Sequence, residues 1–337
     1  MLTPRHGEPE APTAALLNFV SSSNDLEALA LLARHMASAT LTDFTSGVHA
    51  YNWVASASYA LCCGIDAALH RGTRRDAILS VIQPAREAIS ASPFVHRLQR
   101  WPRGYPGDFE TIEYLCDSVN RAPSSTLAHH FERFYLSTPP ASQHRNKLNA
   151  QALHIIDMVA KNPNARILVV AAGGGRDLLL ALPTLRCSGA TVIINDTDPD
   201  AILLCQSRLE ALGTRLEVLQ GNALKVACQL EPSSLDLIVC GGLFDYLPTH
   251  LLKRFLRSLH RLLTADGRLF CTNVVEANPY RTWLEYCADW VLIGRSSADL
   301  AELFSDPRAP YSSITAALDP TGLAHLIIAK KSTPIHA

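Results

Sequence analysis

Hydrophobic and polar positions along the chain follow two patterns, and the change between them falls near residue 165. Before it, apolar residues recur three and four positions apart, as in segments 26–33 and 77–82, which predicts amphipathic helices. Pro84 follows the second of these segments and is expected to end or bend its helix. After residue 165, short apolar runs alternate with segments of helical spacing, which is typical of an α/β domain.

The apolar runs of the second half predict short buried strands. They are Ile167–Val170, Thr191–Asn195, Leu216–Leu219, Leu235–Cys240 and Arg268–Asn273. Helical segments such as 198–212 and 248–263 separate them, and this alternation predicts a parallel sheet covered on both faces. We therefore expect a doubly wound α/β domain over residues 141–337, preceded by a helical region over residues 1–140.

Composition narrows the classes of function. The chain is 48% hydrophobic and 18% charged, as globular proteins are, and its net charge of −1 gives no basic surface for nucleic acid. The most apolar stretch, 54–68, is too short and too rich in Ser and Gly to span a membrane. Nine cysteines without a CxxC pair, and no apolar signal core in residues 1–12, predict reduced thiols and a cytoplasmic protein. His129 and His130 lack further ligands at metal-binding spacing, so no metal is expected.

A small-residue turn links the first predicted strand to the helix after it. The turn reads Ala171–Ala–Gly–Gly–Gly–Arg–Asp177, and its missing side chains let a ligand approach the backbone beside a helix N-terminus. A tight turn without a ligand would have the same sequence. The residues at the ends of the next two strands are therefore needed to choose between these interpretations.

Polar side chains end the second and third predicted strands. Asp196 lies about twenty residues beyond the glycines, where an acid accepts hydrogen bonds from ribose hydroxyls. The alternative role, capping the next helix, suits Asp198 better because Pro199 follows it. Asn222 follows the third strand, where its amide could contact an adenine edge or merely shape a turn.

This set of motifs resembles the class I S-adenosylmethionine (SAM)-dependent methyltransferases over about residues 150–330. The resemblance implies a Rossmann-like sheet, with SAM held by the turn residues Ala171, Gly173 and Gly175, by Asp196 and by Asn222. Three departures affect the amino-acid end of SAM or the adenine contact: Ala171 replaces a glycine, Val169 replaces a strand acid, and Asn222 replaces a common Asp. Flanking residues are also assigned to the cofactor site; they are Asp177, Thr197, Ala223, Gly241 and Phe244.

A narrower resemblance rests on three strings that lie outside the glycine turn. They are Arg103–Asp108 (RGYPGD), Gly242–Leu247 (GLFDYL), and Asn278–Pro279 followed by Asp289–Arg295. These strings are similar to those of bacterial methyltransferases that make hydroxy-fatty-acid methyl ester signals, and of azetidine-2-carboxylate synthases. The resemblance implies a helical N-terminal lid over SAM and a place in secondary metabolism.

Four residues of these strings are the candidates for catalysis: Tyr105, Asp108, Asn278 and Tyr280. A fixed tyrosine ring would attract the sulfonium cation, and Asp108 would accept a hydrogen bond from an amine. Asp108 would equally well cap the helix 109–115. Arg145 is expected to reach the cofactor carboxylate, with capping of its own helix as the alternative.

Three functions remain open at this stage. The first is methyl transfer from SAM to a small amine or carboxylate, which needs chiefly alignment of the nucleophile. The second is cyclisation of SAM to azetidine-2-carboxylate with release of methylthioadenosine, which needs a closed aromatic pocket. The third is a SAM-fold binding module without catalysis. The expected partner is a small molecule or SAM alone, without nucleic acid or membrane, and the oligomeric state is open.

Overall fold

The computed structural model describes residues 25–332, which form two compact units. The helical unit comprises residues 25–107, 117–138 and 279–291, and the sheet unit comprises residues 108–116, 139–278 and 292–332. Each unit therefore draws on three stretches of the chain. The domain boundary expected at residue 140 stays a prediction, as do the parts of those two domains that lie outside the described residues.

The helices of the helical unit are α2 (Asp25–Ser38), η1 (Leu41–Asp43), α3 (Gly47–His70), α4 (Arg75–Ile89), α5 (Pro93–Arg100), α7 (Leu127–Ser137) and η4 (Trp283–Cys287), a π-helix. Ser46 and Ser92 cap α3 and α5 by accepting hydrogen bonds from backbone N–H groups three residues on.

The helix α4 runs through Pro84 to Ile89 instead of ending at the proline. Its buried side chains include Ile78, Ile82, Ala85 and Ile89, which lie on both sides of Pro84 at helical spacing. Burial of this apolar face therefore outweighs the hydrogen bond that the proline removes.

The sheet unit contains one seven-stranded sheet in the order β3-β2-β1-β4-β5-β7-β6. Its strands are β1 (Arg166–Val170), β2 (Thr191–Asp196), β3 (Leu216–Gln220), β4 (Leu235–Cys240), β5 (Leu263–Val274), β6 (Tyr311–Leu318) and β7 (Ala324–Lys331). The first five are parallel, and β7 pairs antiparallel with both β5 and β6. This mixed Rossmann-like sheet confirms the predicted α/β fold and adds two antiparallel strands to it.

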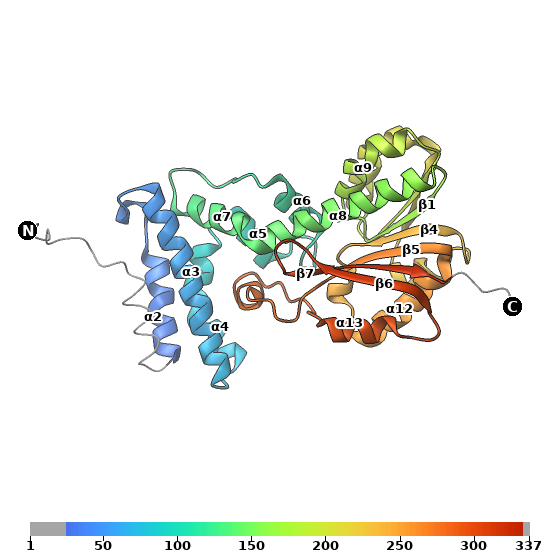
Figure 1. The fold of residues 1–337 in the computed structure, drawn as a ribbon. Coiled ribbons are helices and arrows are strands. Elements are labelled where there is room, and N and C mark those ends of the chain that lie inside the picture. The colour runs from blue at the N-terminus through green and yellow to red at the C-terminus, as the bar shows by residue number, and fades with distance from the viewer. Residues whose placement is uncertain (1–24, 333–337) are drawn as a thin grey trace, which may run out of the picture. The chain divides into compact units, whose positions relative to one another are not determined.

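Helices cover both faces of this sheet (Figure 1). They are α6 (Phe109–Asp117), α8 (Pro139–Lys161), α9 (Arg176–Arg186), α10 (Pro199–Arg208), α11 (Ala223–Val226), α12 (Thr249–Leu262) and α13 (Ser297–Phe304), with short turns η2 (Glu210–Arg215) and η3 (Leu243–Tyr246). Successive side chains of a strand point to opposite faces. Accordingly, Ile167 and Val169 pack with α8 and α9, whereas Leu168 and Val170 pack with α12.

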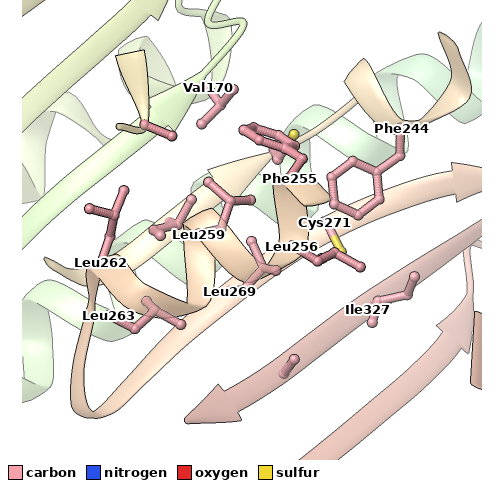
Figure 2. Packing of buried hydrophobic residues seen from close by; sticks show 14 of the residues in the cluster. Val170, Phe244, Phe255, Leu256, Leu259, Leu262, Leu263, Leu269, Cys271 and Ile327 are labelled. Atoms are coloured by element: carbon pink, nitrogen blue, oxygen red, sulfur yellow. The ribbon is translucent and has the colours of Figure 1, made fainter. Parts of the chain in front are cut away.

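One of the two hydrophobic clusters lies between α12 and the sheet. Figure 2 shows Phe255, Leu259 and Leu262 of this helix packed over the strands, with Val170 and Leu269 beside them. Each such fully buried side chain contributes about 1.5–3 kcal/mol to folding. The rigid strands hold the turns at their carboxyl ends in place, and those turns carry the predicted site.

Candidate functional site

The strand order puts a topological switch between β1 and β4. From β1 the chain proceeds to β2 and β3 on one side, whereas β4 and β5 lie on the other. In open α/β sheets, ligands bind in the crevice at the carboxyl ends of the strands beside such a switch. The glycine turn follows β1, Asp196 ends β2, and Gly241 follows β4, so the predicted motifs share this edge.

The glycine turn adopts left-handed backbone at three positions. Ala171 has φ +50°, Gly173 has φ +54° and Gly175 has φ +67°. A Cβ at Gly175 would overlap the sulfur of Cys205 on α10, so both the backbone conformation and the lack of space favour glycine at this position. Ala171, by contrast, has a side chain in a conformation that disfavours one by about 1–2 kcal/mol.

We expect the substitution Ala171→Gly to raise the free energy of unfolding of the sheet unit by about 0.5–1 kcal/mol, because it relieves this strain. Urea unfolding followed by circular dichroism measures the change. Ala172→Gly is the matched control: Ala172 is not among the positive-φ residues, so the added freedom of the unfolded chain should lower stability there. A lower stability of the Ala171→Gly protein would contradict the claim that the backbone at Ala171 is strained.

Asp196 holds the turn from the neighbouring strand. Its Oδ2 accepts a hydrogen bond of 2.8 Å from the Gly173 N–H, and its Oδ1 accepts one of 3.0 Å from the Asp198 N–H. Each carboxylate oxygen keeps a second lone pair, which a ribose hydroxyl could use. Asp198 caps α10 by accepting from the Asp200 N–H at 3.0 Å, and Thr197 between them is exposed. The capping role therefore belongs to Asp198, and Asp196 bridges the ends of β1 and β2.

Asn222 lies exposed at the end of β3 and caps the short helix α11. Its Oδ1 accepts a hydrogen bond of 3.0 Å from the Leu224 N–H, and Ala223 begins the helix. The turn-shaping role is thus present, while the Nδ2 group makes no hydrogen bond with the described residues that would prevent an adenine contact. The adenine contact stays a prediction.

The helix α6 covers the glycine turn, which the sequence did not reveal. Glu113 of α6 accepts hydrogen bonds from Arg176 Nε at 2.5 Å and from both terminal nitrogens of Arg208 at 2.6 Å. Arg208 also donates to the Gly174 carbonyl at 2.6 Å. A Cβ at Gly173 would lie 3.4 Å from the Cβ of Phe109, which begins α6. The RGYPGD string therefore leads into a helix that these hydrogen bonds hold against the glycine turn.

The four residues predicted to be catalytic divide between the two units. Asp108 and Asn278 belong to the sheet unit, whereas Tyr105 and Tyr280 belong to the helical unit. Asp108 is 1% exposed and caps α6, since its Oδ1 accepts from the Thr111 N–H at 2.8 Å. Burial, followed by its hydrogen bond with Tyr59, raises the pKa of Tyr280 to about 12, so this phenol is protonated at neutral pH. The catalytic roles of all four stay predictions.

Two residues predicted to contact the cofactor have other partners. Phe244 belongs to the core: its ring is fully buried, and the ring centres of Phe244 and Phe255 are 6.5 Å apart. Figure 2 shows both rings in this cluster. Arg145 donates to the Leu115 carbonyl at 2.9 Å and to Ser142 Oγ at 3.0 Å, so its guanidinium secures the last turn of α6. The sequence positions of Phe244, after a strand, and of Arg145, within a helix, did not reveal these contacts.

Asp177 lies in the first turn of α9, beside the glycine turn, and is 1% exposed. Its Oδ1 accepts a hydrogen bond of 2.9 Å from the Leu178 N–H, and its Oδ2 has no hydrogen-bond partner among the described residues. Burial raises the pKa of this carboxyl to about 6. The site therefore contains an acceptor that the protein leaves unsatisfied.

We expect Asp177→Asn to stabilise the sheet unit at neutral pH but not at pH 4. The folded state retains a proton that the unfolded chain releases at lower pH, so wild-type stability falls as pH rises from about 4 to 6. The raised pKa of Asp177 corresponds to a loss of about 2–3 kcal/mol in the free energy of unfolding above pH 6. Urea unfolding of both proteins between pH 4 and 7.5 measures the difference, in which all other groups cancel. A difference that does not change with pH would exclude a buried, titrating Asp177.

A buried group of charges lies at the carboxyl ends of β4 and β5. Asp245 Oδ1 accepts from the Val274 N–H at 2.7 Å, and Lys147 Nζ of α8 lies 3.6 Å from Asp245 Oδ2. Arg295 donates to the Phe244 carbonyl at 2.8 Å and to Asn273 Oδ1 at 2.5 Å. Lys147 could not be recognised from the sequence, because only its burial distinguishes it from other lysines.

Within residues 25–332, no three His, Cys, Asp or Glu side chains are grouped as metal ligands would be. No helix in this part of the chain has the length and apolar character needed to span a membrane.

Residues 167–267 match the methyltransferase domain family. Among solved structures, a possible exported protein from Bordetella parapertussis is similar over 93% of this chain and 97% of its own, with a TM-score of 0.58 and 16% identity. Magnesium protoporphyrin IX methyltransferase from Synechocystis, with bound S-adenosylhomocysteine, covers 57% of this chain and 84% of its own (TM-score 0.44, 16% identity). The 1,6-didemethyltoxoflavin-N1-methyltransferase of Burkholderia thailandensis covers 56% and 79% (TM-score 0.42, 19% identity). No curated protein sequence matches the chain.

These comparisons establish the fold. The Bordetella structure shares it over nearly the whole chain, and the segment that matches the methyltransferase domain family contains the glycine turn, Asp196 and Asn222. S-adenosylmethionine is the cofactor of such a domain.

Proposed function

We propose, on the premise that residues 167–267 form a methyltransferase domain, that this chain transfers a methyl group from SAM to an amine or carboxylate of a small molecule. The observation that carries the proposal is the hydrogen bond between the Gly173 N–H and Asp196 Oδ2. It joins the cofactor turn after β1 to the acid that ends β2, at the edge of the sheet where ligands bind.

The residues at this edge fit SAM. Asp196 keeps one lone pair on each carboxylate oxygen for the two ribose hydroxyls, and Asn222 keeps its Nδ2 donors for adenine. The turn at Gly173 leaves backbone open beside the α9 N-terminus, and the buried Oδ2 of Asp177 is an acceptor without a partner. These four residues would hold the adenosine and the turn-facing part of the cofactor.

The protein's contribution to methyl transfer is alignment and exclusion of water. SAM supplies its own leaving group, so a carboxylate acceptor needs no base, while an amine must lose a proton. Asp108 directly precedes the helix α6 and caps it, and Asn278 follows β5 at the carboxyl edge of the sheet. We propose that Asp108 accepts the proton that an amine must lose, and that Asn278 orients the methyl acceptor.

Cyclisation of SAM is the second candidate, and one observation favours it. In the helical unit, the ring of Tyr135 stacks on Trp283 at 4.7 Å and lies 5.2 Å from that of Phe134. Tyr59 packs against Phe134 at 5.7 Å and pairs with Tyr280. Cyclisation needs aromatic side chains that exclude other nucleophiles, and this cluster within the helical unit is compatible with that requirement.

One experiment tests both candidates. Purified protein is incubated with SAM, alone and with a panel of small amines and carboxylates, and the adenosine-containing product is identified by mass spectrometry. S-adenosylhomocysteine formed only with an acceptor supports methyl transfer and excludes cyclisation. Methylthioadenosine formed from SAM alone overturns methyl transfer. Asp196→Ala, which removes the proposed ribose contact, controls for breakdown of SAM without the enzyme.

We retain two further proposals from the sequence: action in the cytoplasm and a role in secondary metabolism. The nine cysteines, all within the described residues, are free thiols, in keeping with a reducing compartment. Release of the native protein with the cytoplasmic fraction of its cell, rather than by osmotic shock, would test the location.

A further inference from the structure

The helix α8 buries a row of polar side chains. Gln143, Lys147 and Gln151 recur every four residues and therefore share one face of the helix. They are 3%, 4% and 5% exposed, and such side chains are rarely buried unless they serve a partner. The question is which partner each of them has.

Two of the three have a partner at the end of β4. The amide of Gln151 packs on Gly241, where a Cβ would overlap it, and Lys147 Nζ lies 3.6 Å from Asp245 Oδ2. The ammonium group of Lys147 has three N–H donors, and its pairing with Asp245 uses one of them, so two remain for a ligand. The Nε2 group of Gln143 is buried and makes no hydrogen bond within the described residues. One helix turn of α8 thus holds unused donors from two side chains.

Buried charged side chains gather at this point. Lys147, Asp245 and Arg295 are at most 4% exposed. Arg295 donates to the Phe244 and Leu247 carbonyls and to Asn273 Oδ1, and it lies near the carboxyl groups of both Asp245 and Asp299. Lys147 pairs with Asp245 alone within the described residues, so its other donors can serve a ligand.

The strand order indicates which anion would come here. Adenine at Asn222 and ribose at Asp196 would lie over β3 and β2, so the rest of the cofactor extends past β1 toward β4. The end of SAM that arrives there carries a carboxylate. Arg145, on the same helix, already donates to the Leu115 carbonyl and to Ser142 Oγ.

We propose that Lys147 and Gln143 bind the carboxylate of the methionine end of SAM. This inference rests on the proposed function, because it takes the adenosine position from it. The ammonium group supplies the charge, the Gln143 amide supplies a second donor, and Asp245 holds Lys147 in place. The missing strand acid at Val169 is then offset by recognition of the other charged group of the same moiety.

The test uses two ligands that differ only at this end. S-adenosylhomocysteine carries the amino-acid group, and methylthioadenosine has a methyl group in its place. Affinities for both are measured by calorimetry with the full chain. The variants are Gln143→Leu, Asp245→Asn, and the double variant Lys147→Met with Asp245→Asn. The last two differ only at position 147, and neither leaves Asp245 as an unpaired buried carboxylate.

We expect the double variant to bind S-adenosylhomocysteine about 10- to 100-fold more weakly than Asp245→Asn, and Gln143→Leu to bind it about 5- to 10-fold more weakly than wild type. Binding of methylthioadenosine should change by less than about threefold in every case. Equal losses for both ligands, or no loss for either, would overturn the carboxylate subsite while leaving the proposed function intact. Wild-type protein that binds neither ligand would overturn the proposed function itself.

Discussion

Replacement of Asp196 by alanine is expected to weaken binding of S-adenosylhomocysteine by at least about 100-fold. Two hydroxyl groups of the ribose would lose a charged acceptor, at about 1.5–3 kcal/mol each. The Gly173 N–H would lose its 2.8 Å hydrogen bond as well, so the glycine turn would lose this connection to β2. Calorimetric titration of wild-type and variant protein measures the ratio.

The matched control for this substitution is Asp198→Ala. Asp198 lies two residues further on, is 7% exposed, and accepts a backbone hydrogen bond as the cap of α10. Its removal should lower stability by about 1 kcal/mol and leave cofactor affinity within about threefold of wild type. Thermal unfolding verifies that both variants are folded. Wild-type affinity in the Asp196→Ala protein would show that the ribose lies elsewhere.

Replacement of Arg295 by methionine is expected to destabilise the sheet unit by about 3–5 kcal/mol. The guanidinium is 2% exposed and donates to the Phe244 carbonyl, the Leu247 carbonyl and Asn273 Oδ1, at 2.8, 2.6 and 2.5 Å. Methionine fills a similar volume but leaves these acceptors buried without a donor. The turn that carries Asp245 would lose one of its connections to the end of β5, and the hydrogen bond from the Val274 N–H to Asp245 would remain.

Urea unfolding midpoints of the two proteins measure this effect. Arg308→Met is the control, because the Arg308 side chain is 66% exposed and pairs with Asp306 on the surface. It should leave the midpoint unchanged within error, since exposed ion pairs contribute little. If Arg295→Met shifted the midpoint no more than Arg308→Met does, the buried network at the ends of β4 and β5 would not be structural.

The strands β1, β2 and β4 could be predicted because each is an apolar run buried on both faces. The edge strand β3 is only half-buried but keeps three apolar residues, Leu216, Val218 and Leu219. The sequence missed β6 because it is an edge strand whose residues after Tyr311 are exposed, so Ser312, Ser313 and Thr315 gave no hydrophobic signal. The partner strand β7 alternates between buried and half-buried positions and follows a turn at Asp319. Antiparallel strands at the end of a parallel sheet thus escape a search for continuous apolar runs.

Features of the candidate site that depend on strand-end positions could be predicted from the sequence, whereas those that depend on distant side-chain pairs could not. The turn at Gly173 and the acid at Asp196 follow from strand-end positions alone. The clamp of Glu113 on Arg176 and Arg208 joins residues 63 and 95 positions apart, and no local pattern encodes it. For the same reason, the sequence favoured Arg145 on α8, whereas burial distinguishes Lys147 on another face of that helix.

The crystal structure of the protein with S-adenosylhomocysteine tests the proposed cofactor site most closely. We predict that both ribose hydroxyls lie within hydrogen-bond distance of the Asp196 carboxylate, that adenine lies beside Asn222, and that the sulfur lies beside the turn at Gly173. Adenosine bound away from the carboxyl ends of β1 and β2, or Asp196 without a contact to it, would contradict the site and the function inferred from it.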